Sequence, residues 1–154
     1  MSARALYRIA AILFLLFAVG HTFGFLSFKP PTADALAVRD AMNTVHFEVG
    51  GTSFSYGGFY IGFGLNATLY LIFSAFLAWH LGNMSVAYPA AIGMLGWIFF
   101  AIQIVSLALS WMYFSIAPAI FSALVAICLG WSAWMVQQMP PATGRSRSSP
   151  VQPS

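Results

Sequence analysis

Residues 5–26 read ALYRIAAILFLLFAVGHTFGFL, an apolar run with one arginine near its start and a His-Thr pair near its end. An α-helix needs about 20 such residues to cross a hydrocarbon core of about 30 Å. Three further runs of this kind occupy residues 59–81, 89–109 and 112–136. Only 6% of the residues are charged, whereas a soluble domain carries about 25%. The sequence therefore predicts a membrane protein with four transmembrane helices.

The connections between these runs predict how the helices follow one another. The second and third runs are joined by Gly82-Asn83-Met84-Ser85, and the third and fourth by little more than Ser110-Trp111. Connections this short make consecutive helices antiparallel neighbours, and lipid favours helices because they bond their own backbone groups. We therefore predict an all-α fold, an up-down bundle of four transmembrane helices that forms one domain over residues 1–138.

The first run has a second interpretation, as a secretory signal peptide. Arg4 and Arg8 form a basic start, residues 9–19 an apolar centre, and Ala18-Val19-Gly20 resembles a small-residue cleavage site. However, apolar character resumes in residues 23–26, so the whole stretch is long enough to span a membrane. The length favours an uncleaved transmembrane helix.

The distribution of charge predicts the orientation. Four basic residues lie near the start of the first run or after the fourth run, namely Arg4, Arg8, Arg145 and Arg147. The first loop contains two basic residues and all three acids, namely Lys29, Arg39, Asp34, Asp40 and Glu48. The positive-inside rule places both termini in the cytoplasm and the first loop outside. We expect the membrane to be the inner (plasma) membrane of the cell. The Pro- and Ser-rich residues 139–154 read as a disordered cytoplasmic tail. A net charge of +3 is too small to suggest nucleic acid as a partner.

The first loop is the only substantial segment outside the apolar runs. Thr32 is a suitable N-cap and Asp34 lies in the favourable first turn of a helix. Apolar residues then recur at helical spacing, which predicts a short extracytoplasmic helix on the membrane surface, ending near Gly50-Gly51. The polar and aromatic residues 52–58 are predicted to be flexible.

A four-residue repeat on the second apolar run predicts how the helices pack. Small and polar residues recur at Gly58, Gly62, Asn66, Tyr70, Ser74 and Ala78. Small residues let helix backbones approach closely in lipid. We interpret this stripe as a packing face of the bundle or as a dimer face. The partners that we consider are a second copy of the chain, which would form a homo-oligomer, and a membrane partner subunit.

Aromatic side chains favour the two membrane interfaces. Tyr7, Trp79, Tyr88, Trp131 and Trp134 are predicted at the cytoplasmic interface, and Tyr56, Tyr60, Trp111 and Tyr113 at the outer one. Trp97 lies well inside the third run and is interpreted as a packing residue.

Polar side chains at membrane depth are costly and often functional. His21, Asn66 and Gln103 come from three different runs, and a rise of about 1.5 Å per residue places them at one level in the outer half of the membrane. His46, Glu48, Tyr56 and Tyr60 are close enough in sequence to the same end to join them. The coincidence of depth predicts an outer-leaflet pocket for a lipid-soluble small molecule.

Each of these residues also has a plainer interpretation as interhelical contact, because Asn, Gln and His in membrane helices contribute about 0.6 to 2 kcal/mol to packing. Three function classes remain open. The first is a non-enzymatic binding or accessory protein without a cofactor. The second is a redox protein in which His21 and His46 ligate haem or a metal ion, with Glu48 as a further candidate ligand for a metal ion. The third is an enzyme that uses His21 or Glu48 as acid or base. No nucleophile motif or carboxylate pair supports the third, and we favour the first.

Three short segments carry a resemblance to a known family. They are Gly20-His21-Thr22-Phe23-Gly24, His46-Phe47-Glu48, and Tyr56-Gly57-Gly58-Phe59-Tyr60. In these segments the chain resembles a family of small, uncharacterised four-helix bacterial integral membrane proteins, over about residues 5 to 137. The resemblance implies the four-helix topology and supplies no activity.

Overall fold

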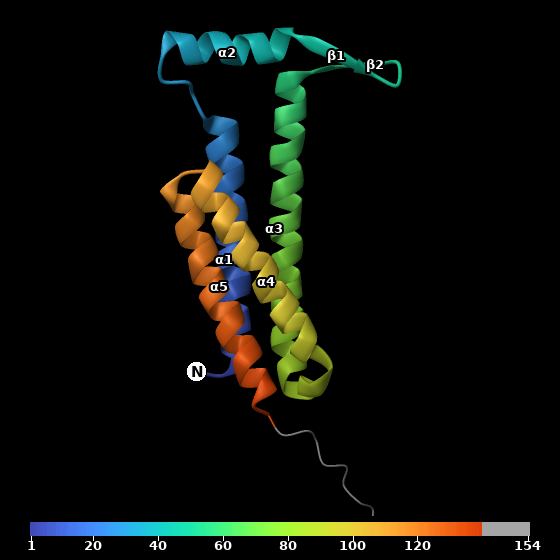
Figure 1. The fold of residues 1–154 in the computed structure, drawn as a ribbon, viewed down its shortest axis with the longest axis vertical. Coiled ribbons are helices and arrows are strands. Elements are labelled where there is room, and N and C mark those ends of the chain that lie inside the picture. Colours follow the sequence, from blue (N-terminus) through green and yellow to red (C-terminus); the bar gives the residue numbers. More distant parts are fainter. Residues whose placement is uncertain (140–154) are drawn as a thin grey trace, which may run out of the picture.

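A computed structural model describes residues 1–139, which form five helices and one β-hairpin (Figure 1). Four of the helices are long and apolar enough to cross a membrane: α1 (Ala3–Ser27), α3 (Tyr56–Ala87), α4 (Pro89–Tyr113) and α5 (Ile116–Gln137). The prediction of a helical protein with four helices of membrane length is confirmed. The predicted tail, residues 139–154, lies outside the described residues except for Met139.

Both predicted helix connections are displaced. Residues 82–85 are helical, because α3 continues to Ala87, and the chain turns at Tyr88 before Pro89 begins α4. Proline suits the first turn of a helix and cannot continue the preceding one. The second connection is at Phe114–Ser115 rather than at residues 110–111. Glycine and serine within residues 82–85 were mistaken for a turn, whereas in lipid they serve helix packing.

The first loop contains the short helix α2 (Ala33–Thr44), capped by Thr32, whose hydroxyl accepts a hydrogen bond from the amide of Ala35. The helix ends at Thr44 rather than near residues 50–51. An antiparallel hairpin of β1 (His46–Val49) and β2 (Thr52–Ser55) follows, so the prediction of a flexible segment after residue 51 is wrong. Gly50 and Gly51 have φ angles of 60° and 79°, and such a two-residue turn favours glycine because both positions are left-handed.

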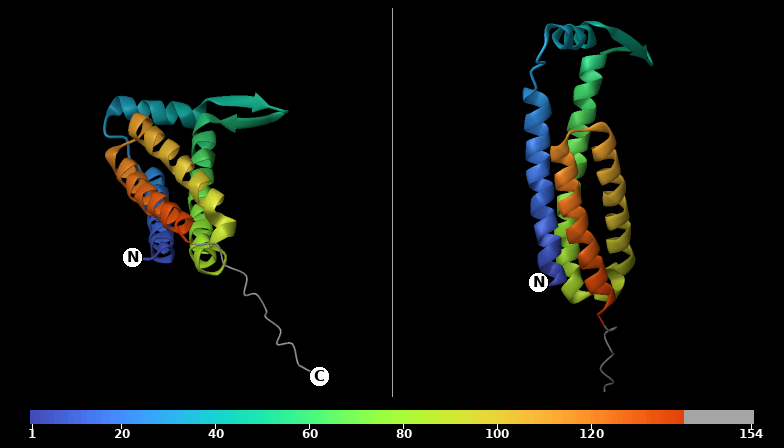
Figure 2. Two further views of the ribbon diagram at one scale, coloured as in Figure 1. Left: turned by 60° about the horizontal axis from the view of Figure 1, so that its bottom comes forward. Right: turned by 60° about the vertical axis from the view of Figure 1, so that its left-hand side comes forward.

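The long helices contact one another to very different extents. α1 packs along both α3 and α5, and α5 packs along α4, whereas α3 and α4 make few contacts. Figure 2 shows α4 and α5 as a pair beside α1, while α1 and α3 extend further towards α2 than this pair does. The two ends of the helix assembly therefore have different structures.

At the end that carries the N-terminus the helices meet around Tyr7, whose side chain is 0% exposed. A methyl group added to Gly82 of α3 would lie 3.2 Å from the Tyr7 Cβ atom. One added to Gly96 of α4 would lie 2.5 Å from the Tyr7 hydroxyl and 3.3 Å from Ala133 of α5. Residues from all four long helices therefore approach one tyrosine. The side chain of Tyr7 is therefore packed between helices, and its predicted depth at the cytoplasmic interface stays a prediction.

Over its first half, the predicted stripe of α3 is not a packing face between the helices of one chain, and its interpretation as a dimer face stays a prediction. Gly58, Gly62, Asn66 and Tyr70 are not covered by the rest of the chain, Ser74 is half-buried, and only Ala78 is fully buried. The covered face of α3 includes residues that, from Gly64 onward, are spaced alternately by four and three: Gly57, Gly64, Thr68, Leu71, Ala75, Ala78, Gly82 and Ser85. A strict four-residue repeat turns about 40° per step around a helix of 3.6 residues per turn. The stripe therefore begins on the outer face and reaches the packed face only at its end.

Candidate functional site

His21 of α1 is half-buried and faces α3. Its Nε2 atom lies 3.2 Å from the carbonyl oxygen of Gly64, so the hydrogen-bonded form donates from Nε2–H. The imidazole is flanked by the rings of Phe17 and Phe25, at centroid distances of 6.4 and 5.2 Å. This environment corresponds to the interhelical interpretation of His21.

A polar contact that the sequence analysis missed lies one residue further along α1. The hydroxyls of Thr22 and Thr68 are 2.7 Å apart, and each also lies within hydrogen-bond distance of a carbonyl oxygen of its own helix, that of Ala18 or Gly64. Because a hydroxyl has one proton, one threonine donates to its own carbonyl and accepts from the other threonine. The sequence contains a signal for this contact. Gly64 and Thr68 are small residues four positions apart, a spacing that places both on one face of the helix and favours close packing against a neighbouring helix. With His21, these two threonines form a polar seam between α1 and α3.

Gln103 of α4 is 4% exposed and faces α5. Its Nε2 atom donates to the carbonyl oxygen of Ser122 at 3.3 Å, and the hydroxyls of Ser110 and Ser122 lie 3.4 Å apart. Gln103 therefore connects α4 to α5, whereas His21 connects α1 to α3.

Asn66 does not join either pair. Its side chain is uncovered, because Gly64 faces α1 and a residue two positions further along a helix points about 200° away. His21, Asn66 and Gln103 thus have separate surroundings, and no hydrogen bond within residues 1–139 brings them into the common pocket predicted from their depth. Sequence position predicted their depth, and it could not predict which way each side chain points.

His46, Glu48 and Tyr56 lie at the hairpin. Alternate residues of a strand share a face, so His46 and Glu48 of β1 do point to one side, and both are exposed. The Nδ1 atom of His46 is 2.8 Å from the carbonyl oxygen of Thr44, and Tyr56 packs on Phe47 with ring centroids 4.8 Å apart. Within residues 1–139 no group of three or more metal-ligating side chains occurs. The haem or metal hypothesis for His21, His46 and Glu48 thus gains no support from the geometry.

A hollow of about 350 Å³ lies at this end of the molecule, between the end of α1, the helix α2 and the start of α3. Its apolar walls come from all of these segments, in Phe25, Leu26, Phe28, Val38, Met42 and Ile61. Arg39, Asn43 and Tyr60 supply its polar side chains. Tyr60 is the one member of the predicted ligand-binding set that lines the hollow.

Beside the hollow, α2 and α1 each approach α3 closely at a glycine. Gly57 is buried, and a methyl group added to it would collide with the side-chain oxygen of Asn43, so the missing side chain lets α2 rest on α3. A methyl group added to Gly64 would lie 2.7 Å from the ring of Phe25. The Phe25 ring, which also contacts His21, forms part of the wall. The polar seam therefore lies directly beside the hollow.

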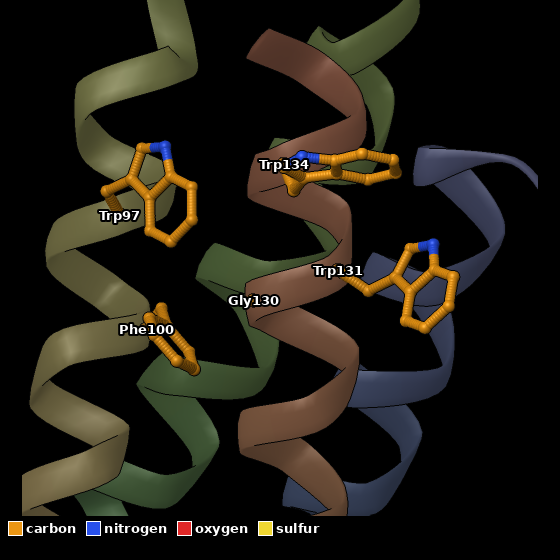
Figure 3. Close-up of a pocket in the computed structure, with 5 residues that line it drawn as sticks. All are labelled: Trp97, Phe100, Gly130, Trp131 and Trp134. Carbon is orange, nitrogen blue, oxygen red and sulfur yellow. The ribbon is translucent and has the colours of Figure 1, made fainter. Parts of the chain in front are cut away.

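A second hollow, of about 410 Å³, lies between α4 and α5 near the opposite end and is lined by Trp97, Phe100, Gly130, Trp131 and Trp134 (Figure 3). Gly130 lies close to Phe100, since a methyl group added to it would lie 2.8 Å from the Phe100 ring. Trp97 is 37% exposed and donates to Gln137 at 3.2 Å, so the interpretation of Trp97 as a packing residue is only partly right. A groove of indole rings without a charged group suits contact with lipid at an interface.

Comparisons of the chain with protein families, with curated proteins and with solved structures returned no match.

Proposed function

We propose that this chain is an inner-membrane protein that binds a lipid-soluble ligand in the hollow beneath α2, without chemical conversion of that ligand. The observation that carries the proposal is the composition of the hollow, whose mostly apolar lining includes three polar side chains, two from α2 and one from α3. Ligand sites commonly combine a mostly apolar lining with a few polar groups that orient the ligand. The ligand class that fits is an amphipathic molecule that reaches the hollow from the bilayer.

In this proposal α1, α3, α4 and α5 cross the membrane as an up-down bundle, with α1 retained as a transmembrane helix. Both termini lie in the cytoplasm, because the basic residues at the chain ends outnumber those of the first loop. The helix α2 then lies on the outer surface. Support for α1 as a structural element comes from its buried residues, among them Tyr7, Ala10 and Phe14.

The orientation can be tested with single cysteines. Cys128 is the only cysteine of the chain, so Cys128→Ala gives a cysteine-free background. An impermeant thiol reagent applied to intact cells should label Asp34→Cys and should not label Ser2→Cys. Labelling of Ser2→Cys alone would invert the proposed orientation.

The binding function can be tested by filling the hollow. Ala35 lines it, whereas Ala37 is exposed on the opposite face of α2 and does not. The purified full chain would be incubated with an equimolar mixture of dioctanoyl phosphatidylglycerol and dioctanoyl phosphatidylcholine, and bound lipid counted by native mass spectrometry. We expect Ala35→Trp to lower total bound lipid about tenfold, because the indole side chain would fill the hollow and take the place of the lipid. Ala37→Trp should leave total bound lipid unchanged. Equal binding by both variants would refute the proposal.

A further inference from the structure

The charged residues of α2 are unevenly placed around the hollow. Arg39 lines it, whereas Asp34 and Asp40, the other charged residues of this helix, do not. The hollow therefore faces one positive charge of α2 and neither of its negative charges.

Arg39 has no hydrogen bond to protein within residues 1–139. The guanidinium hydrogen bonds of this part of the chain belong to Arg4 and Arg8, which each reach the side-chain oxygen of Asn83 at 3.4 Å. A guanidinium presents several N–H donors in a planar fork that matches the oxygens of a phosphate. The donors of Arg39 thus remain available to a bound anion.

Two neutral donors accompany this cation. Asn43 lies one turn after Arg39 on the same face of α2, and Tyr60 lines the hollow from α3. A carboxamide and a phenol can each donate to a phosphate oxygen. Phe25 and Ile61, which belong to the membrane-length helices α1 and α3, supply apolar wall. The site therefore combines anion-binding groups with an apolar surface that continues along the membrane helices.

The size of the hollow limits what it can enclose. Its volume of about 350 Å³ is at the lower end of the range of about 300–1,000 Å³ for small-molecule sites. It suits a head group, with the acyl chains left in the bilayer beside α1 and α3. We infer that the hollow binds the phosphate head group of an anionic membrane lipid, with Arg39 as its counter-charge and Asn43 and Tyr60 as further donors. This inference rests on the proposed function.

The test measures head-group preference separately from total binding. Native mass spectrometry of the full chain with the equimolar lipid mixture gives the ratio of bound dioctanoyl phosphatidylglycerol, which is anionic, to bound dioctanoyl phosphatidylcholine, which is zwitterionic. Arg39→Gln should lower this ratio about fivefold, equivalent to about 1 kcal/mol, the order expected for the loss of one hydrogen-bonded contact with the phosphate. Arg39→Lys should keep most of the preference. Lys29→Gln, which removes an equal charge from a residue that does not line the hollow, should leave the ratio unchanged.

The outcomes separate the two proposals. If Ala35→Trp removes bound lipid but Arg39→Gln leaves the ratio unchanged, the hollow binds lipid without using Arg39, and this inference alone fails. If Ala35→Trp has no effect, the hollow is not the binding site and the proposed function fails as well. Inorganic phosphate at ten times the lipid concentration should not displace phosphatidylglycerol. Complete displacement would overturn the inference by assigning the site to a free anion.

Discussion

The two ends of the helix assembly use small residues in opposite ways. At the N-terminal end, Gly82 and Gly96 bring α3 and α4 against Tyr7, which is 0% exposed. At the other end, Gly57 and Gly64 admit Asn43 and Phe25 beside a hollow of about 350 Å³. Glycine thus closes one end around a single side chain, while at the other end it supports the walls of a space.

This difference suggests that the end around Tyr7 contributes mainly to the stability of the protein and the end beneath α2 mainly to binding. Close packing of small residues contributes most where several helices meet, because helix association in lipid depends on packing rather than on the hydrophobic effect. Regions with fewer buried contacts open more readily, and binding segments are commonly drawn from them. α2, which has no fully buried residue, belongs to the second kind of region. Substitutions at the Tyr7 end should therefore affect unfolding, and those beneath α2 should affect local order and binding.

The largest effect is expected at Tyr7. Tyr7→Ala should lower the free energy of unfolding by about 3–5 kcal/mol, the cost of removing a buried aromatic ring. Tyr60→Ala, which removes a ring that is 57% exposed, should cost less than about 1 kcal/mol. Thermal unfolding in detergent, monitored by size-exclusion chromatography of heated samples, compares the stability losses of the two variants.

Tyr7→Phe tests whether the hydroxyl matters. Within residues 1–139 the buried Tyr7 hydroxyl has no hydrogen-bond partner, so its removal should be neutral or stabilising by up to about 1 kcal/mol. If Tyr7→Phe is as damaging as Tyr7→Ala, the hydroxyl and not the packing of the ring holds this end together.

The next effect concerns Gly96. Gly96→Val should be destabilising by about 1–3 kcal/mol, because the new side chain collides with the hydroxyl of Tyr7, whose side chain is 0% exposed. Gly93 lies almost one turn earlier on α4, and a methyl group added there meets no atom within 4 Å. Gly93→Val is thus a matched control for the same change in the same helix. Equal shifts of the unfolding temperature in the two variants would show that helix propensity, and not the contact with Tyr7, determines the result.

A smaller and local effect is expected at Gly57. Gly57→Ala should displace the Asn43 side chain while improving helix propensity, so global stability should change little. Hydrogen exchange of the α2 amides should become about fivefold faster, equivalent to about 1 kcal/mol of local stability. Gly62→Ala gains the same propensity and meets no atom within 4 Å, so α2 should keep its protection. Unchanged exchange in Gly57→Ala would show that Asn43 does not hold α2 on α3.

Features that depend on the chain's local sequence were predictable. The four apolar runs predicted four long helices, and Thr32 predicted the start of α2. The glycine pair at residues 50 and 51 favours the end of a helix, but two adjacent glycines also favour a hairpin turn, and in the structure they form the turn between β1 and β2. The ends of α3 were misplaced because glycine and serine mark turns in water and packing positions in lipid.

Features that depend on helix rotation were not predictable from one sequence. Depth follows from residue number, so His21, Asn66 and Gln103 could be placed at one level. The direction of each side chain depends on which face of its helix is packed, and over the first half of α3 the four-residue repeat follows a face that no other helix of the chain covers. Of the predicted ligand-binding residues, only Tyr60 lines the hollow beneath α2. Arg39 and Asn43 were missed because α2 was considered only as a surface helix.

The smallest effect compares two polar side chains at similar depth, Gln103 and Asn66. Gln103→Leu removes a buried hydrogen bond to Ser122 and should cost about 0.6 kcal/mol, the average for such bonds between membrane helices. Asn66 is uncovered, so Asn66→Leu should be neutral or stabilising, because the substitution removes a carboxamide exposed to hydrocarbon. Unfolding in detergent should be measured at two protein concentrations tenfold apart. A concentration-dependent loss in Asn66→Leu would contradict this expectation, because only an Asn66 covered by a second chain would respond in that way.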